Sequence, residues 1–153
     1  MESPNEMSVS RIWVMAGDDS DLNTIGAGWT GDAYEHIYIN MECPGFVQTS
    51  PGIAIGCSFT EMSTFNGDQK DATFSIHKDP NSGNWWVQLQ DISLGYYRSS
   101  LFTLLSKTSD RVEFGGEVYN GRYNGRHTTT QMGNGHFPSE GGLGISSSLV
   151  MFK

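Results

Sequence analysis

The 153-residue sequence predicts an all-β fold, an antiparallel β-sandwich with one short helix. Its 19 glycines and a charged fraction of only 17% indicate many turns and few long helices, because glycine suits turns and weakens helix interiors. A 12% aromatic content supplies large core side chains, although the hydrophobic fraction is only 37%. Short β-rich runs between turn clusters give about eleven expected strands.

The first half of the chain contains five of these expected strands. Residues 11–16 are β-rich and are followed by an acidic turn. Residues 24–30 follow as a strand in which Gly26 and Gly28 indicate a bulge or a close backbone approach. Residues 53–59 are a continuous run of apolar and small residues, which predicts a strand buried on both faces. The remaining two strands are expected at residues 36–41 and 45–49.

The second half shows the clearest alternation. Ala72, Phe74 and Ile76 are expected on one face of a strand that a turn over residues 79–83 connects to its hairpin partner. Residues 99–106 predict the one helix, about two turns long and capped by a serine. Further strands are expected at residues 85–90, 92–97, 111–119, 127–132 and 145–152.

Residues 10–153 are expected to form a single domain after a disordered tail over residues 1–9. The polar N-terminus predicts no signal peptide in this chain. Cys43 and Cys57 are compatible with one disulfide or with two buried thiols.

Charge and hydropathy exclude two classes of partner. The formal net charge is −8, and the nine lysines and arginines are scattered singly, which disfavours nucleic-acid binding. No apolar run approaches the roughly 20 residues that cross a bilayer, so no membrane partner is expected. The four histidines lack ligand spacing, and we expect neither a metal nor a cofactor.

An unusual segment is Val112–Val118, in which Gly115 and Gly116 precede Glu117. Adjacent glycines inside a strand remove side chains beside the carboxylate, which would let a substrate backbone lie against the sheet. The alternative interpretation is a bulge with Glu117 solvated on an exposed face.

Several motifs occur in an order that closely resembles the neprosin family of plant proteins, over about residues 10–141. They are RIWV (11–14), LNTI (22–25), AGW (27–29), CPGFVQT (43–49), GNWW (83–86), GYY (95–97), LF (101–102), GGEV (115–118) and the run HTTTQMGNGHFP (127–138).

The resemblance implies a glutamic-peptidase-like β-sandwich whose groove holds two catalytic glutamates and cuts peptides at proline. In such a pair one carboxylate ionises and acts as general base, while the protonated one polarises the carbonyl, at acidic pH and without metal. The resemblance also implies an extracellular protein whose partners are peptides or proteins, including proline-rich ones.

The resemblance places one family glutamate at Glu117 and the other at the position of Gly26. A glycine can serve neither as base nor as acid, so catalysis is predicted to be impaired. Three acidic residues are candidates to replace the missing carboxylate: Asp19, Asp21 and Glu35. The groove is expected to bind substrate through Gly115, Gly116, Trp29, Gln131 and Tyr97.

Three functional hypotheses follow. The first is a neprosin-type domain that has lost efficient catalysis but keeps its peptide-binding groove. The second is a weakly active proline-directed endopeptidase with a substitute carboxylate. The third is a non-enzymatic domain that binds carbohydrate or peptide by stacking on aromatic rings, unless these rings belong to the core. The candidate rings are Trp29, Trp85, Trp86, Tyr96 and Tyr97.

The sequence ends soon after the motif at residues 135–138, so the domain is expected to be incomplete at its C-terminus. A sandwich without its last strands would expose a sheet edge.

Overall fold

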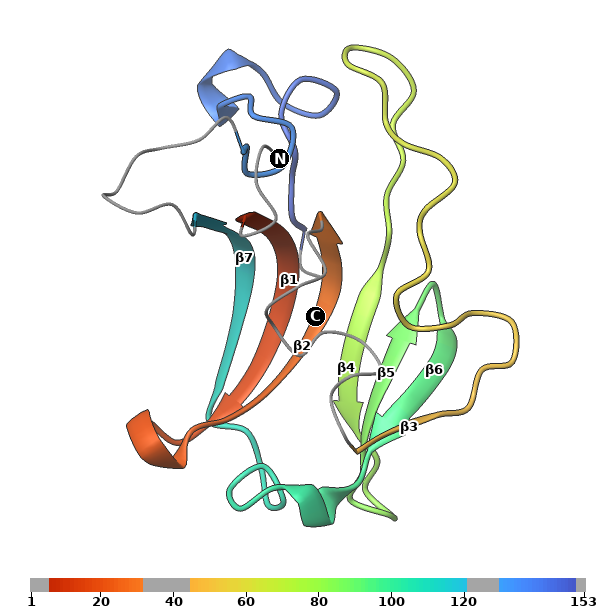
Figure 1. The fold of residues 1–153 in the computed structure, drawn as a ribbon, viewed down its shortest axis with the longest axis vertical. Coiled ribbons are helices and arrows are strands. Elements are labelled where there is room, and N and C mark those ends of the chain that lie inside the picture. The colour runs from red at the N-terminus through yellow and green to blue at the C-terminus, as the bar shows by residue number, and fades with distance from the viewer. Residues whose placement is uncertain (1–5, 32–44, 121–129, 151–153) are drawn as a thin grey trace.

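The computed structural model describes residues 6–31, 45–120 and 130–150 and shows two antiparallel sheets side by side (Figure 1). One sheet has the order β2-β1-β7, with β1 at Glu6–Ala16, β2 at Asn23–Gly31 and β7 at Arg111–Asn120. The other has the order β3-β6-β5-β4, with β3 at Phe46–Gln48, β4 at Phe74–Lys78, β5 at Trp85–Leu89 and β6 at Ile92–Tyr97. The predicted all-β sandwich class is confirmed.

The central strand β1 organises the first sheet. Val14 lies opposite Ile25 of β2 and Val112 of β7, and both ladders continue from this row without a change of register. Val14 and Ile25 are buried. Because side chains alternate across a strand, the even-numbered residues of β1 face the second sheet and the odd-numbered ones face away from it.

The second sheet is a meander around β5. In its buried row Val87 lies opposite Ile76 of β4 and Gly95 of β6, and the ladder to β6 shifts register between Val87 and Gln88. The turn before β5 is held by the Asp79 carboxylate, which accepts hydrogen bonds from the backbone and the hydroxyl of Ser82. These bonds lower the pKa of Asp79 from its ordinary value.

Two buried clusters join the sheets. One contains Val14, Ala16, Ile25, Trp85 and Leu105. The other contains Ala27, Val87, Leu89 and Leu94. Each takes residues from both sheets, so the interface between the sheets is the hydrophobic core.

The segment from β6 to β7 crosses between the sheets and is fixed by polar contacts. Trp85 Nε1 donates to the carbonyl of Leu105 at 2.8 Å. Lys78 Nζ donates to the carbonyls of Leu105, Ser106 and Lys107 at 3.0, 2.6 and 2.8 Å. From the first sheet, Asn23 Oδ1 accepts from the N–H of Leu104 at 2.8 Å. The loop is therefore tied to both sheets.

The predicted helix over residues 99–106 is wrong beyond its first turn, since only Ser99–Leu101 forms a 3-10 helix. The N–H groups of Leu104 and Leu105 donate to Asn23 Oδ1. Lys78 Nζ donates to the carbonyls of residues 105–107. These tertiary contacts use the groups that a second helical turn needs. No α-helix occurs in the part of the chain that the structure describes.

Three predicted strands are also wrong where the structure describes them. Residues 53–59 are irregular and largely exposed, because a turn bond from Cys57 N–H to the Ala54 carbonyl interrupts the run. Residues 145–150 begin in a turn closed by a bond from Ile145 N–H to the Gly142 carbonyl, and residues 130–132 pair with no strand. Residues 36–41 and 127–129 lie outside the described ranges.

The N-terminal boundary of the sheet also differs from the prediction. The tail expected over residues 1–9 is wrong from Glu6 onward, because β1 begins there and its residues Met7 and Val9 are buried. Residues 1–5 lie outside the described ranges. Within those ranges we find no helix with the length and apolar character needed to cross a bilayer.

The crossing loop generates a stability prediction. Leu105 is 0% exposed and packs in the cluster that joins the sheets, so Leu105→Ala should lower the free energy of unfolding by about 2–5 kcal/mol. Urea denaturation followed by tryptophan fluorescence measures the change. Leu101→Ala, at a side chain that is 50% exposed, is the control and should cost less than about 1 kcal/mol. Equal losses in the two variants would contradict this role of Leu105.

Candidate functional site

Position 26 and Glu117 lie on the same face of the β2-β1-β7 sheet. Gly26 pairs with Trp13, and Glu117 pairs with Val9, two odd-numbered residues of β1. Directly paired residues point to the same side of a sheet, so both positions belong to the face that points away from the second sheet. We call this the outer face.

The two positions are nevertheless offset along the outer face. Four residues of β1 separate their partners Trp13 and Val9, which is about 13 Å along the strand. They also sit on opposite sides of β1, which adds about 10 Å across two strand spacings. The Cα atoms of Gly26 and Glu117 are therefore roughly 16 Å apart.

Between these two positions lies a row in which the residues on both sides of β1 are glycines. Arg11 pairs with Gly28 of β2 on one side and with Gly115 of β7 on the other. A Cβ built at Gly115 would meet no atom of the described residues within 4 Å, whereas one at Gly28 would collide with the backbone of Ser10 and Arg11. Arg11 is thus the one side chain of this row, and its Nη2 donates to Thr30 Oγ1 at 3.1 Å.

Gly26 itself has room for a side chain. A Cβ there would lie 3.5 Å from Trp13 Cδ1 and 3.8 Å from Arg11 Cδ, which are ordinary contact distances. Gly26 and Gly28 pair regularly with β1, so the bulge considered for them is absent. The same holds for Gly115 and Gly116, while Glu117 is exposed as that alternative expected.

The substitute carboxylates weighed from the sequence are not brought to Glu117. Asp19 and Asp21 form the 3-10 turn after β1, at the end of the sheet opposite to the Val9–Glu117 pair (Figure 1). Glu35 lies outside the described residues. Sequence reasoning missed Glu113, which pairs with Trp13 and so shares the outer face. Its four-residue spacing from Glu117 within one strand was the available signal.

The predicted substrate-binding residues are divided between two faces. Gly115 is on the outer face, but Gly116 and Trp29 both pair with Ser10 and point toward the second sheet. Met132 fills the space over Gly116, where a Cβ would approach its Cγ to 2.7 Å. The structure therefore does not gather this set around Glu117.

The other two predicted substrate-binding residues do not share the outer face with Glu117. Gln131 is exposed, and its carbonyl accepts from Ser8 Oγ at 2.8 Å. Tyr97 packs between the sheets with its ring 4.9 Å from that of Phe46 and 6.3 Å from that of Phe102. Gln131 thus belongs to the C-terminal segment and Tyr97 to the core.

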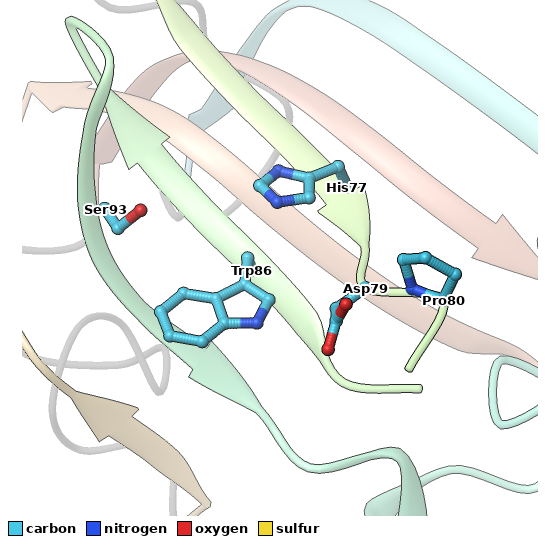
Figure 2. A pocket seen from close by; sticks show the side chains of 5 residues that line it. All are labelled: His77, Asp79, Pro80, Trp86 and Ser93. Carbon is cyan, nitrogen blue, oxygen red and sulfur yellow. The ribbon is translucent and has the colours of Figure 1, made fainter. Parts of the chain in front are cut away.

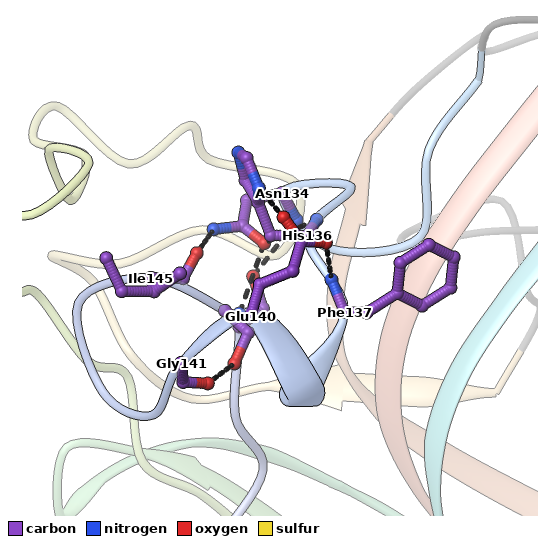
Figure 3. A network of polar contacts seen from close by, with 8 residues as sticks. Asn134, His136, Phe137, Glu140, Gly141 and Ile145 are labelled. Atoms are coloured by element: carbon purple, nitrogen blue, oxygen red, sulfur yellow. Dashed lines mark hydrogen bonds and ion pairs between the residues drawn. The ribbon is translucent and has the colours of Figure 1, made fainter.

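The C-terminal motif folds as a polar turn (Figure 3). The Glu140 carboxylate accepts from the N–H of Phe137 at 2.7 Å and lies 3.0 Å from His136 Nδ1. Asn134 Nδ2 donates to the carbonyl of Ile145 at 2.7 Å. The bond to His136, and next the bond to Phe137 N–H, lower the pKa of Glu140. These contacts indicate that the polar residues of the motif stabilise the turn.

A hollow of about 400 Å³ lies on the far side of the second sheet (Figure 2). Trp86 and His77 point into it together with Ser93, and Asp79 and Pro80 line it at the turn that follows β4. The ring of Tyr96 lies 4.9 Å from that of Trp86. Trp85 and Val87 point the other way, into the core. The alternation of β5 therefore places Trp86 at the hollow and Trp85 in the core.

Cys57 is an exposed free thiol, whereas Cys43 lies outside the described residues. Within residues 6–31, 45–120 and 130–150, no three His, Cys, Asp or Glu side chains are grouped so that they could hold a metal ion.

Acid should loosen the C-terminal turn. Because the folded state lowers the pKa of Glu140, its stabilisation is present above the pKa of the unfolded chain and is lost as the pH falls through the folded value. Hydrogen exchange of residues 134–147 should accelerate across that acidic window in the wild type, after correction for the intrinsic pH dependence of exchange. Glu140→Gln should exchange fast at neutral pH already, and Asp71→Asn should behave like the wild type. A Glu140→Gln turn that remains as protected as the wild type at neutral pH would refute this.

The chain matches the model of a known protein family. The family model described as Neprosin matches residues 29–149, which is most of the chain and includes β7 with Glu117. The match begins after Gly26, which the register of β2 places on the same face as Glu117. The chain belongs to the neprosin family.

Proposed function

We propose that this neprosin domain is a glutamic-peptidase-like module that binds peptides, including proline-rich ones, and has lost efficient hydrolysis. One observation carries the proposal. The outer face presents the carboxylate of Glu117, but the position that the family resemblance assigns to the second glutamate is Gly26.

A glutamate pair works because two close carboxylates cannot both ionise easily. One then holds a proton to polarise the peptide carbonyl, and the other activates water. Glu117 has no ion pair within the described part of the chain, and Gly26 has no side chain to supply the second group. A single solvated carboxylate lacks the neighbour that would divide the two roles.

The offset between the two positions supports the same conclusion. Glutamate pairs act with their carboxylates a few ångströms apart, whereas the Cα atoms of Gly26 and Glu117 are about 16 Å apart and the row of Arg11 lies between them. Catalytic geometry tolerates only small displacements.

The outer face remains suited to peptide binding. Gly115 leaves open space beside Glu117, which allows a ligand backbone to approach the sheet closely. The half-buried ring of Trp13 and the stem of Arg11 add apolar surface next to it. An extended peptide therefore finds space, an anionic group and apolar contacts together.

A weakly active proline-directed endopeptidase is the competing function. By register Glu113 is the described carboxylate in the same row as position 26, with Trp13 between them. Its Oε1 already lies 3.2 Å from Arg111 Nε. This engagement favours a structural role for Glu113 over that of a second catalytic carboxylate.

The proposal predicts no turnover. The wild type, Glu117→Gln and Gly26→Glu are incubated with an unfolded proline-containing peptide at acidic and neutral pH, and products are followed by mass spectrometry. None should cleave it, while the wild type binds an uncleaved fluorescent version in an anisotropy assay. Gly26→Glu should fold, because its Cβ makes ordinary contacts, and circular dichroism checks this. Cleavage by the wild type that Glu117→Gln abolishes would establish a substitute carboxylate and the competing function.

A second candidate function, saccharide binding, is favoured by the hollow beside Trp86. The Trp86 ring lines the hollow and packs at a tilt against the ring of Tyr96, with centroids 4.9 Å apart. Ser93 Oγ accepts from Gln88 Nε2 at 3.1 Å, which leaves its own hydroxyl proton for a ligand. An aromatic face beside neutral donors suits a sugar ring.

The hollow gives a separate prediction. Trp86→Ala should weaken binding of neutral soluble oligosaccharides at least about threefold in isothermal titration calorimetry, because stacking contributes about 0.5–1.5 kcal/mol beyond buried area. Tyr119→Ala, at an exposed ring on the other sheet, should leave binding unchanged. If the wild type binds no member of a panel of neutral oligosaccharides, this second function is excluded.

A further inference from the structure

Strand β7 forms a long free edge. It pairs with β1 alone within the described part of the chain, over residues Glu6–Met15 of that strand (Figure 1). Its 10 residues leave a row of N–H and C=O groups facing outward from the sheet. Such an edge is a template for another extended segment.

The two faces of this edge differ in chemistry. Val112 and Phe114 point toward the second sheet, yet each is 49% exposed. They remain uncovered because β4 of the second sheet lies against β2 and β1. Glu113 and Glu117 point to the outer face. Apolar and acidic positions thus alternate along one open edge.

The outer face of β7 presents the charge of Glu117 and an open space over Gly115. Arg111 already pairs with Glu113 at 3.2 Å and with Asp18 at 3.5 Å, but Glu117 has no ion pair among the described residues. Between the two glutamates, no atom of the described residues lies within 4 Å of a Cβ built at Gly115. A strand lying beside β7 can place a cation at Glu117 and a large side chain over Gly115, as aromatic side chains do over glycines in sheets.

We propose that the β7 edge binds an extended peptide as a fourth, antiparallel strand of the β2-β1-β7 sheet. The peptide alternates apolar β-branched residues, which lie beside Val112 and Phe114, with outward residues that are basic opposite Glu117 and aromatic opposite Gly115. This deepens the proposed peptide binding and rests on it. The net charge of −8 also favours a basic partner.

A second copy of the chain fits this edge less well. A symmetric antiparallel β7–β7 pair that matches the open Gly115 positions sets Glu113 opposite Glu117 twice. Like charges directly opposite each other destabilise a sheet. A basic peptide places opposite charges there instead.

The test uses the full chain and a labelled peptide, Thr-Lys-Val-Trp-Val-Lys-Val, designed to run opposite residues 118 to 112. Its affinity is measured by fluorescence anisotropy at low ionic strength. A peptide with glutamate in place of both lysines should bind more weakly. Methylating alternate backbone nitrogens gives two further peptides, and only one of them should lose affinity, by about tenfold or more, since only one set of amides faces the edge.

Matched variants assign the site. Glu117→Gln should weaken binding of the lysine peptide by roughly two- to fivefold, the range for one cross-strand ion pair. Glu117→Lys should reverse the preference toward the glutamate peptide. Glu61→Gln, which removes an exposed carboxylate from the loop before β4, should change nothing. Hydrogen exchange should show new protection in β7 when peptide is bound.

The outcomes separate this inference from the proposed function. If the proline-containing peptide binds but the lysine peptide does not, or if both methylated peptides bind equally well, strand addition is wrong while peptide binding stands. If no peptide binds, both proposals fail. If sedimentation shows a dimer that the lysine peptide does not dissociate, the edge is filled by a second copy and the assignment of a peptide partner is overturned.

Discussion

The carbonyl of Leu105 and the side chain behind it hold this sandwich together. The carbonyl accepts from Trp85 Nε1 and from Lys78 Nζ, both in the second sheet, while the side chain is completely buried against Val14 and Ile25 of the first. This loop thereby links the two sheets at one cluster, and the sheets also pack directly on each other through the second cluster, where Ala27 meets Val87, Leu89 and Leu94. A buried carbonyl with two donors avoids the penalty of an unsatisfied acceptor, and the leucine adds apolar burial at the same point.

The second sheet covers only part of the inner face of the first sheet. The second sheet lies against β1 and β2, so β7 keeps an open edge and exposed apolar residues such as Val112 and Phe114. On the outer face Glu117 is exposed and a Cβ built at Gly115 meets no described atom within 4 Å, whereas Val9, the β1 partner of Glu117, is buried. The proposed peptide binding at the outer face and strand addition at β7 thus both involve parts of the first sheet that the second sheet does not cover. The hollow at Trp86 lies on the other sheet and is independent of both.

Catalysis, in contrast, depends on a relation between two side chains, and here one is missing. Gly26 supplies no carboxylate for the pair, and the four-residue offset along β1 places the two positions too far apart. A groove needs only shape and a few contacts, whereas a glutamate pair needs two carboxylates at close range. Binding can therefore persist in a family member whose hydrolytic chemistry is lost.

The sequence by itself determined the class of fold, every described strand except the start of β1 to within about two residues, the family, and the identity of the residue at position 26. These follow from local alternation, turn chemistry and ordered motifs, which neighbouring residues encode. Tertiary structure alone decided the rest. The second turn of the expected helix gave way to bonds with Asn23 and Lys78, and the strand expected at residues 53–59 found no partner. Tyr97 lies on β6 of the second sheet and packs in the core, and Trp29 points away from the face that carries Glu117, because strand pairing, and not sequence distance, sets which face of a sheet a side chain occupies.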